Sequence, residues 1–149
     1  MAHIRQMEAR DIPEVARMEK ETFTMPWSEK SFAEALEREG SLYLVAEENG
    51  ILGYCGCYVI LDEADVNQVA VRADLRGQGL GKELVSEMIR ILKERGIDSI
   101  TLEVRKSNAA AIRLYESVGF VSEGVRKNFY EKPTEDALIM WKRQSVSKG

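Results

Sequence analysis

A short glycine-rich stretch is the first feature of this sequence that could do chemistry. Residues 76–82 read RGQGLGK, with Gly77, Gly79 and Gly81 between an arginine and a lysine. Residues 83–96, ELVSEMIRILKERG, follow with apolar residues at helical spacing. A glycine-rich turn that opens a helix directs backbone N–H groups at an anion, and the helix adds partial positive charge. The stretch therefore predicts a phosphate site, because an ordinary helix start does not need the entropic cost of three glycines.

Two common phosphate motifs do not fit this stretch. A Walker A loop needs glycine five positions before Gly81 and serine or threonine after the lysine, but the chain has Arg76 and Glu83 there. A dinucleotide fingerprint, GxGxxG, accepts Gly77 and fails at Lys82. The predicted phosphate site is therefore of another kind, with Arg76 and Lys82 as additional positive charges.

Composition and charge exclude several classes of function. The 149 residues, enough for one domain, carry 21 basic and 25 acidic side chains, and the net charge of −4 argues against a direct nucleic-acid binder. No apolar run is long enough to span a membrane and the N-terminus lacks a signal-peptide pattern, so a cytoplasmic location is expected. His3 is the only histidine, which excludes most His-based metal sites and His-dependent triads. Acid–base chemistry would then fall to carboxylates, tyrosines or lysines, and no metal is expected.

The elements that must position this chemistry can be predicted along residues 1–149. Asp11 and Ser28 are expected to cap the first two helices and Gly40 to stop the second. A long helix should end at Gly96, and a shorter one should begin at Ser107 or Asn108. The pattern predicts a single α+β domain with a mixed, mostly antiparallel sheet of about seven strands, about four flanking helices and a frayed tail from about residue 144. Strands are expected within residues 3–9, 41–72 (three strands, with turns at 48–50 and 62–65), 99–105, 121–132 and 135–143.

The glycine-rich stretch also carries a resemblance. RGQGLG, from Arg76 to Gly81, resembles the R/Q-x-x-G-x-G/A signature of the GNAT superfamily of N-acetyltransferases, whose order of elements matches the prediction over nearly the whole chain. Longer segments resemble the RimI-type ribosomal-protein-alanine N-acetyltransferases within it. These segments are PWSEKSF (26–32), LEVRKSNAAAIRLYESVGF (102–120), RKNFY (126–130) and EDALIM (135–140).

The resemblance implies both a reaction and a site for the acetyl donor. Acetyl would pass from acetyl-CoA to the α-amine of a protein N-terminus, in bacterial members that of a small-subunit ribosomal protein that begins with alanine. The backbone of Val69, Ala70 and Val71 would pair with the pantetheine arm, with an oxyanion-binding amide near Val71. Asn108 would contact the cofactor, cap its helix, or do both. The pyrophosphate would be held by Gly77, Gln78, Gly79, Leu80, Gly81 and Lys82, and Arg76 would assist or pair with an acid instead.

The same resemblance assigns the two catalytic residues, Glu103 as general base and Tyr115 as the acid that protonates the leaving thiolate. Glu103 lies in mid-strand and should point away from the face of Leu102 and Val104, which is also typical of a solvated strand face. Tyr115 could equally be a core tyrosine. Asp62 or Glu63 is the alternative base if Glu103 proves buried and paired.

Other readings stay open at this point. The enzyme could acetylate a lysine or a small-molecule amine, or the chain could be a non-catalytic acetyl-CoA-binding module. Cys55 or Cys57 could carry the acetyl group in a ping-pong mechanism, but no histidine lies near them in sequence and buried reduced cysteines are expected. Aromatic and acidic residues that either frame an acceptor cleft or serve packing and solvation are Trp27, Phe129, Tyr130, Asp62, Glu63 and Asp65.

Overall fold

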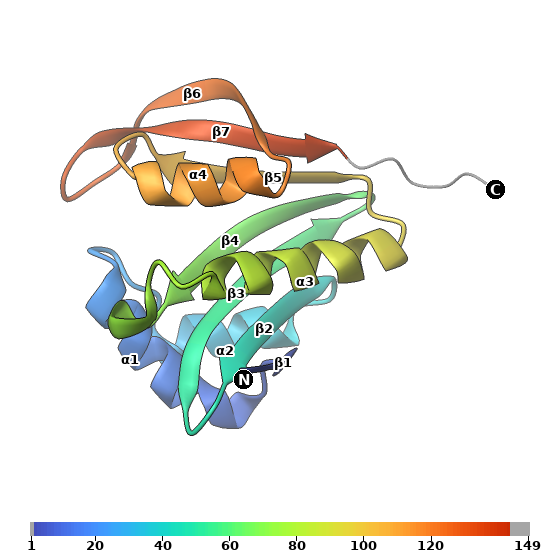
Figure 1. Cartoon of the computed structure of the whole chain (residues 1–149), viewed down its shortest axis with the longest axis vertical. Helices are drawn as coiled ribbons and strands as arrows, with labels where there is room; N and C mark the ends of the chain where they lie inside the picture. The colour runs from blue at the N-terminus through green and yellow to red at the C-terminus, as the bar shows by residue number, and fades with distance from the viewer. Residues whose placement is uncertain (1, 144–149) are drawn as a thin grey trace.

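The expected α+β fold is present in the computed structural model, which describes residues 2–143 (Figure 1). The predicted frayed tail lies outside the described residues. The helices are α1 (Ile12–Thr22), α2 (Glu29–Glu37), α3 (Leu80–Glu94) and α4 (Ala109–Ser117), with 3-10 turns at Ala9–Asp11 and Ala73–Leu75. The strands are β1 (His3–Gln6), β2 (Ser41–Glu47), β3 (Ile51–Ile60), β4 (Glu63–Val71), β5 (Ser99–Arg105), β6 (Val121–Tyr130) and β7 (Glu135–Arg143).

All seven strands form one sheet in the order β1-β2-β3-β4-β5-β7-β6. Every pair is antiparallel except β4 and β5, which run parallel because α3 connects them. That parallel pairing is short, since it joins only residues 63–66 of β4 to residues 99–102 of β5. Beyond it the strands separate, and Figure 1 shows β5, β7, β6 and α4 diverging from the rest of the sheet.

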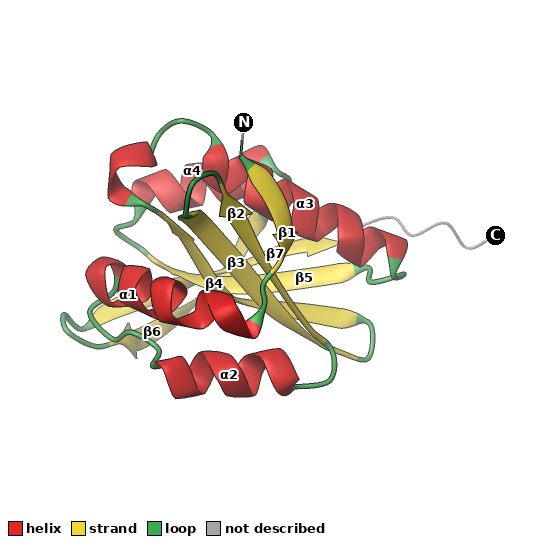
Figure 2. Cartoon of the chain, turned by 90° about the horizontal axis from the view of Figure 1, so that it is seen from below, coloured by secondary structure: helices red, strands yellow, loops and turns green. Residues whose placement is uncertain are grey.

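Helices cover both faces of the sheet, with α1 and α2 on one side and α3 and α4 on the other (Figure 2). The larger apolar core lies on the α3/α4 side and includes Leu84, Met88 and Ile100, all with no exposed surface. A smaller core on the α1/α2 side contains Phe32 and Tyr54, which are also fully buried. Each such apolar side chain stabilises the fold by about 1.5–3 kcal/mol relative to an exposed one.

Two local predictions about these elements are confirmed. The Ser28 hydroxyl accepts a hydrogen bond from the Ser31 N–H at 3.1 Å, which is the capping bond expected at the start of α2. The turn between β2 and β3 lies at Asn49-Gly50, where both residues have positive φ (56° and 121°). Asparagine and glycine tolerate this conformation, which explains why the dipeptide marks a hairpin so reliably.

Two other local predictions are wrong in detail. The turn between β3 and β4 falls at Leu61-Asp62 rather than over residues 62–65, so Glu63 and Asp65 belong to β4. The Asp11 side chain does not cap α1. It accepts a hydrogen bond from the Glu8 N–H at 2.8 Å and two from the guanidinium of Arg5, both at 2.8 Å. An ion pair from β1, which the local pattern does not encode, takes the carboxylate away from the helix.

Candidate active site

The glycine-rich stretch forms an open loop in front of α3. Gly77 and Gly79 have φ of 77° and 87°, a left-handed conformation that residues with a side chain rarely adopt, and no atom beyond the adjacent residues lies within 4 Å of where their Cβ atoms would be. Gly79 is also the N-cap of α3 and has no side chain to bond the first turn. Since the first helical bond is Glu83 N–H to the Gly79 carbonyl at 3.0 Å, the N–H groups before it can meet an anion.

The third glycine of the loop has a different role. A Cβ on Gly81 would lie 2.8 Å from a methyl of Leu114 in α4 and 3.5 Å from a methyl of Val71 in β4. The absence of a side chain thus lets the start of α3 pack closely against α4 and the end of β4. Gly81 therefore allows close packing that fixes the end of the loop, whereas Gly77 and Gly79 allow its left-handed backbone conformation.

The polar side chains of the loop are arranged around these glycines. Arg76 donates from Nε to the Val71 carbonyl at 3.2 Å, which ties the loop to the last residue of β4. Gln78 donates to the Asp74 carbonyl at 3.4 Å. Among residues 2–143 Arg76 forms no ion pair, so the alternative that it pairs with an acid is not what this structure has. Both the Arg76 guanidinium and Lys82 add positive charge at the loop.

A fork in the sheet lies beside this loop, where β4 leaves β5. Its β4 arm contains a bulge, because Gly56 of β3 faces Gln68 while the next β3 residue, Cys57, faces Val66. Asn67 is the extra residue, and it begins the part of β4 that no longer pairs with β5. Beyond it Val69, Ala70 and Val71 pair with β3 along one edge only. Apart from the Val71 carbonyl, which accepts from Arg76, the backbone groups of their other edge can pair with an extended ligand.

Glu103 is the first residue on the β5 arm of the fork. Its side chain points away from Leu102 and Val104, which are buried in the larger core, and 20% of it is exposed. Arg126 of β6 lies 3.6 Å from the carboxylate, measured from Nε to Oε1, and this arginine is itself 57% exposed. Glu103 is therefore reachable and only loosely paired, so the condition for turning to Asp62 or Glu63 as the base is not met.

Two further titratable groups interact electrostatically with Glu103. Burial and the nearby Glu103 charge raise the pKa of Asp65 in β4 above its ordinary value. Burial and the same charge raise the pKa of Tyr130 in β6 to about 12. The ring of Tyr130 is held by Arg105, whose guanidinium lies 4.5 Å from the ring centroid and donates to the carbonyls of Glu131 and Pro133. The fork thus concentrates acidic groups beside an aromatic side chain.

Tyr115 reaches the fork from α4, on the opposite face of the sheet from Glu103. It is 8% exposed and its ring packs against Phe120 at 5.7 Å between centroids. Burial raises the pKa of its hydroxyl, and Cys55 and Tyr130 act in the same direction. No side-chain oxygen buried among the described residues lacks a hydrogen-bond partner, and the Tyr115 hydroxyl forms no such bond, so solvent reaches it. Tyr115 is a core tyrosine with an available hydroxyl.

The remaining predicted site residues have simpler surroundings. The Asn108 side chain accepts a hydrogen bond from the Ala111 N–H at 3.1 Å, so it is the N-cap of α4, and its amide group can still donate. Cys55 and Cys57 are fully buried in the larger core, and burial raises the pKa of Cys55 well above its ordinary value and that of Cys57 to about 12. Protonated buried thiols are poor nucleophiles, which disfavours a cysteine-bound acetyl group.

Sequence reasoning missed a buried carboxylate, Glu19 of α1, which is only 1% exposed. It accepts hydrogen bonds from the Tyr54 hydroxyl at 2.5 Å, from the Trp27 backbone N–H at 3.0 Å and from the Gln68 side chain. Burial raises the pKa of Glu19. The only sequence signal is a glutamate at an inward position of an amphipathic helix, where an apolar residue would be usual.

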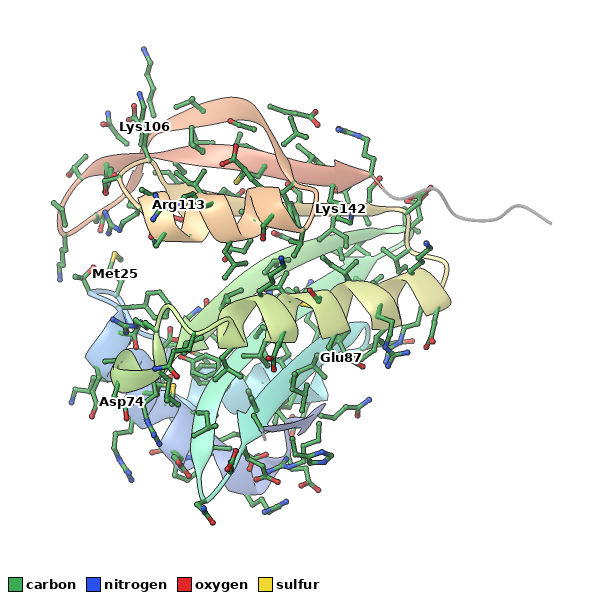
Figure 3. The ribbon with its side chains drawn as sticks, viewed as in Figure 1. Met25, Asp74, Glu87, Lys106, Arg113 and Lys142 are labelled. Carbon is green, nitrogen blue, oxygen red and sulfur yellow. The ribbon has the colours of Figure 1, made fainter. Side chains whose placement is uncertain are left out.

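The segment between α1 and α2, residues 23–28, borders the face to which Glu103 points. The Trp27 ring packs on Phe32 and Tyr43, with centroids 5.3 and 6.4 Å apart. Met25 is 52% exposed, and in Figure 3 it projects from this segment on the side where the two parts of the sheet diverge. Trp27 therefore packs inside while Met25 stays available to a partner.

The described residues hold no group of three or more potential metal ligands, counting histidine, cysteine, aspartate and glutamate. None of the helices within residues 2–143 is both long and apolar enough to cross a membrane.

Comparisons with known proteins place this geometry in context. A model of the acetyltransferase (GNAT) family matches residues 12–120. A protein of Escherichia coli named ribosomal protein bS18-alanine N-acetyltransferase is 40% identical over 147 residues, covering 94% of this chain and 96% of its own length.

Solved structures agree with this match. The crystal structure of the ribosomal-protein-S18-alanine N-acetyltransferase from Escherichia coli superposes with a TM-score of 0.91 at 38% identity and covers 100% of this chain and 98% of that one. A structure of the NatC complex bound to Gag peptide and CoA matches with a TM-score of 0.86 at 21% identity, over 97% of this chain and 99% of that one, which shows a shared fold.

Proposed function

Because this chain belongs to the acetyltransferase (GNAT) family, and within it to the ribosomal-protein-alanine N-acetyltransferases of the RimI type, we propose that it acetylates the N-terminal alanine of ribosomal protein bS18. It is an N-acetyltransferase, and acetyl-CoA is the donor that its family uses. The acceptor is the one named for the Escherichia coli relative. A cytoplasmic site of action follows from a ribosomal acceptor.

The proposed reaction is a direct transfer in a ternary complex. An α-amine has a pKa of about 7.7–8.0, so it is partly protonated at neutral pH and must lose its proton to attack a thioester. Glu103 takes that proton, directly or through water, as the N–C bond forms, and the C–S bond breaks when the tetrahedral intermediate collapses. The position of Glu103 supports this role, since it is partly exposed, pairs among the described residues only with the exposed Arg126 at 3.6 Å and lies where β4 and β5 separate.

Tyr115 donates to the sulfur as negative charge develops there. Its raised pKa keeps the hydroxyl protonated at every physiological pH, which suits a hydrogen-bond donor. Thiols have pKa values of about 8.5, below that of tyrosine, so full proton transfer to the thiolate is uphill and hydrogen bonding is the larger part of the effect. A backbone N–H near Val71, on the unpaired edge of β4, stabilises the oxyanion of the tetrahedral intermediate.

The donor would be held along the fork and the loop. The backbone of Val69, Ala70 and Val71 would pair with the pantetheine arm, and the loop from Arg76 to Lys82 would bind the pyrophosphate. Supporting features are the left-handed glycines, the uncapped start of α3 and the two positive side chains. The amide group of Asn108, whose carbonyl is already used as a cap, would add a donor.

The single observation that carries the proposal is Glu103 at the vertex of the fork, and thiol release from acetyl-CoA tests it. The acceptors are an Ala-starting bS18 peptide, its Nα-blocked twin, a lysine peptide and spermine. Turnover is expected with the free Ala peptide alone. Turnover with the blocked or lysine peptide, or with spermine, would instead identify a lysine or small-molecule acetyltransferase. No turnover with any of the four acceptors, although acetyl-CoA binds, would contradict the proposal and favour a non-catalytic module.

A further inference from the structure

Glu19 is the strongest unexplained feature outside the residues assigned to chemistry. A carboxylate with 1% exposure normally pairs with a cation, because burying a charge is costly. Glu19 has no cationic partner among the described residues, and three hydrogen-bond donors converge on it instead. Such a group needs a reason beyond packing, since an apolar side chain of similar size would avoid the cost.

The three donors come from separate parts of the molecule. Tyr54 belongs to β3 and is itself in the core, so its bond anchors one carboxylate oxygen, Oε1. The other oxygen, Oε2, is shared by the Trp27 backbone N–H and the Gln68 side chain. Oε2 therefore links the segment between α1 and α2 to the arm of β4 that no longer pairs with β5.

The bulge in β4 makes this link possible. Without the extra residue, Asn67 and Gln68 would point to opposite faces of the sheet. With it, both reach the α1/α2 face, where Asn67 donates to the Tyr43 hydroxyl at 3.4 Å and Gln68 donates to Glu19. Asp65 lies just before them on β4 and interacts electrostatically with Glu103. Hydrogen bonds thus link Trp27 through Glu19 to the strand that carries Asp65.

We propose that Glu19 is a positioning residue for the acceptor. It fixes residues 23–28 against β4, and this sets where an acceptor N-terminus lies relative to Glu103. The inference rests on the proposed function for its kinetic readout. It concerns the bridge through Oε2 and not the negative charge itself.

The test compares Glu19→Gln with Glu19→Leu, which both remove the charge at similar side-chain size. Glutamine preserves the bridge, because its carbonyl can accept from Trp27 and Gln68 while its amide donates to the Tyr54 oxygen. Leucine abolishes it. With the Ala-starting peptide, Glu19→Leu is expected to raise KM at least about tenfold, the equivalent of one hydrogen bond to a charged group, and Glu19→Gln to stay near the wild type.

Two further readouts separate positioning from stability. The Kd for acetyl-CoA should be unchanged in both variants, because the hydrogen bonds of Glu19 involve neither the glycine loop nor the backbone of Val69, Ala70 and Val71. Backbone hydrogen exchange of residues 23–28 should be faster in Glu19→Leu and unchanged in Glu19→Gln. An unchanged peptide KM in folded Glu19→Leu, or equal impairment of both variants, would overturn the inference. If the wild type does not acetylate the peptide, the proposed function fails, and the exchange comparison still decides whether Glu19 positions the segment.

A second pair of variants covers the case in which Glu19→Leu does not fold. Gln68→Leu cuts the tie to β4, whereas Tyr54→Phe removes a donor from the same carboxylate but leaves the Oε2 bridge intact. The peptide KM should rise in Gln68→Leu and stay near the wild type in Tyr54→Phe, whatever their melting temperatures. A KM that tracks the loss of stability in both variants would instead assign Glu19 a structural role alone.

Discussion

The glycine loop at residues 76–82 and the segment at residues 23–28 flank the proposed reaction from opposite faces of the sheet, and they are built in opposite ways. The loop depends on its backbone. Gly77 and Gly79 have open space where a Cβ would be, and the N-terminus of α3 behind them adds partial positive charge. The other segment depends on side chains far apart in sequence, since Trp27 is held by Glu19, which is held by Tyr54 and Gln68.

This difference suits two different ligands. Under the proposed function the loop binds the pyrophosphate of acetyl-CoA, for which a fixed arrangement of backbone N–H groups is sufficient. Acceptors differ between relatives, and a segment held by side-chain contacts can be moved by changing one of them. We therefore expect variants in the loop itself to change donor binding, and variants in residues 23–28 or on the face that they border to change catalysis or acceptor use.

The largest expected effect is that of Glu103→Gln, which should lower kcat by about 10²–10⁴-fold, because general-base catalysis contributes that much. The acetyl-CoA Kd from calorimetry should stay near the wild type, since Glu103 lies on the face away from α3 and α4. The matched control is Glu123→Gln, an exposed glutamate of β6 paired with Arg143, which should turn over normally. A large loss of donor affinity in Glu103→Gln would break the division between the two sides.

Gly79→Asp should weaken acetyl-CoA binding by about tenfold to a hundredfold. A side chain at φ 87° is strained, at a cost of about 1–2 kcal/mol, and a carboxylate repels the pyrophosphate. Gly96→Asp is a matched control, because Gly96 also has φ of 79° with open space, and it lies beyond the other end of α3, whose 15 residues span about 22 Å. Equal loss of binding in both variants would mean that strain in α3, and not the loop, explains the effect.

Tyr115→Phe should lower kcat by about tenfold to a hundredfold, less than Glu103→Gln, because it removes a hydrogen bond to the developing thiolate rather than the base. Since Tyr115 lies on the α3/α4 side of the sheet, a lower kcat in this variant would show that residues on this side contribute to the chemical step as well as to donor binding. Single-turnover kinetics with saturating donor isolates the step. A normal rate would leave Tyr115 as a core residue only.

The smallest expected effect concerns stability in acid. The Arg5 guanidinium beside Asp11 holds the pKa of that carboxyl below its unfolded value of about 3.9. The resulting stabilisation is complete above that pH and is lost as the pH falls through the lower folded pKa. Urea unfolding of the wild type should therefore weaken from pH 5 toward about pH 2.5 more steeply than that of Asp11→Asn.

Asp74→Asn is the control for this acid effect on the loop side. Its carboxylate pairs with Arg72, but it is 64% exposed and lies at the surface in Figure 3, so water screens the pair. This variant should follow the wild-type acid profile. If the loss of stability in acid became equally shallow in Asp74→Asn and Asp11→Asn, the exposed and the buried carboxylate would contribute alike, which would contradict the expected difference.

The features that the sequence predicted correctly are those specified by neighbouring residues. Ser28 caps α2 and Asn49-Gly50 turns the chain, each because a local backbone conformation favours that residue. The alternation in β5 likewise placed Glu103 on the face opposite Leu102. Local patterns predict these features because each feature depends on the residues of a single helix, strand or turn.

The features that the sequence did not predict depend on residues 6 to 49 positions apart. Asp11 binds Arg5 instead of capping its helix, and Glu19 collects donors from Tyr54 and Gln68, which are 35 and 49 positions away. The bulge at Asn67 has no glycine or proline on β4 itself to mark it. Where several elements must meet before a side chain has a partner, a local pattern cannot identify that partner.

The short contact between β4 and β5 gives the molecule an incomplete sheet. Only residues 63–66 and 99–102 join its two parts, and beyond them each part presents a free edge to the other. A bound pantetheine arm along β4 would take the place of a missing strand, so the donor would complete the sheet as well as supply the acetyl group. At 100 times its Kd such a ligand adds about 2.7 kcal/mol to the free energy of unfolding. The abundance of acetyl-CoA in a cell would thereby also set how firmly the two parts of this enzyme hold together.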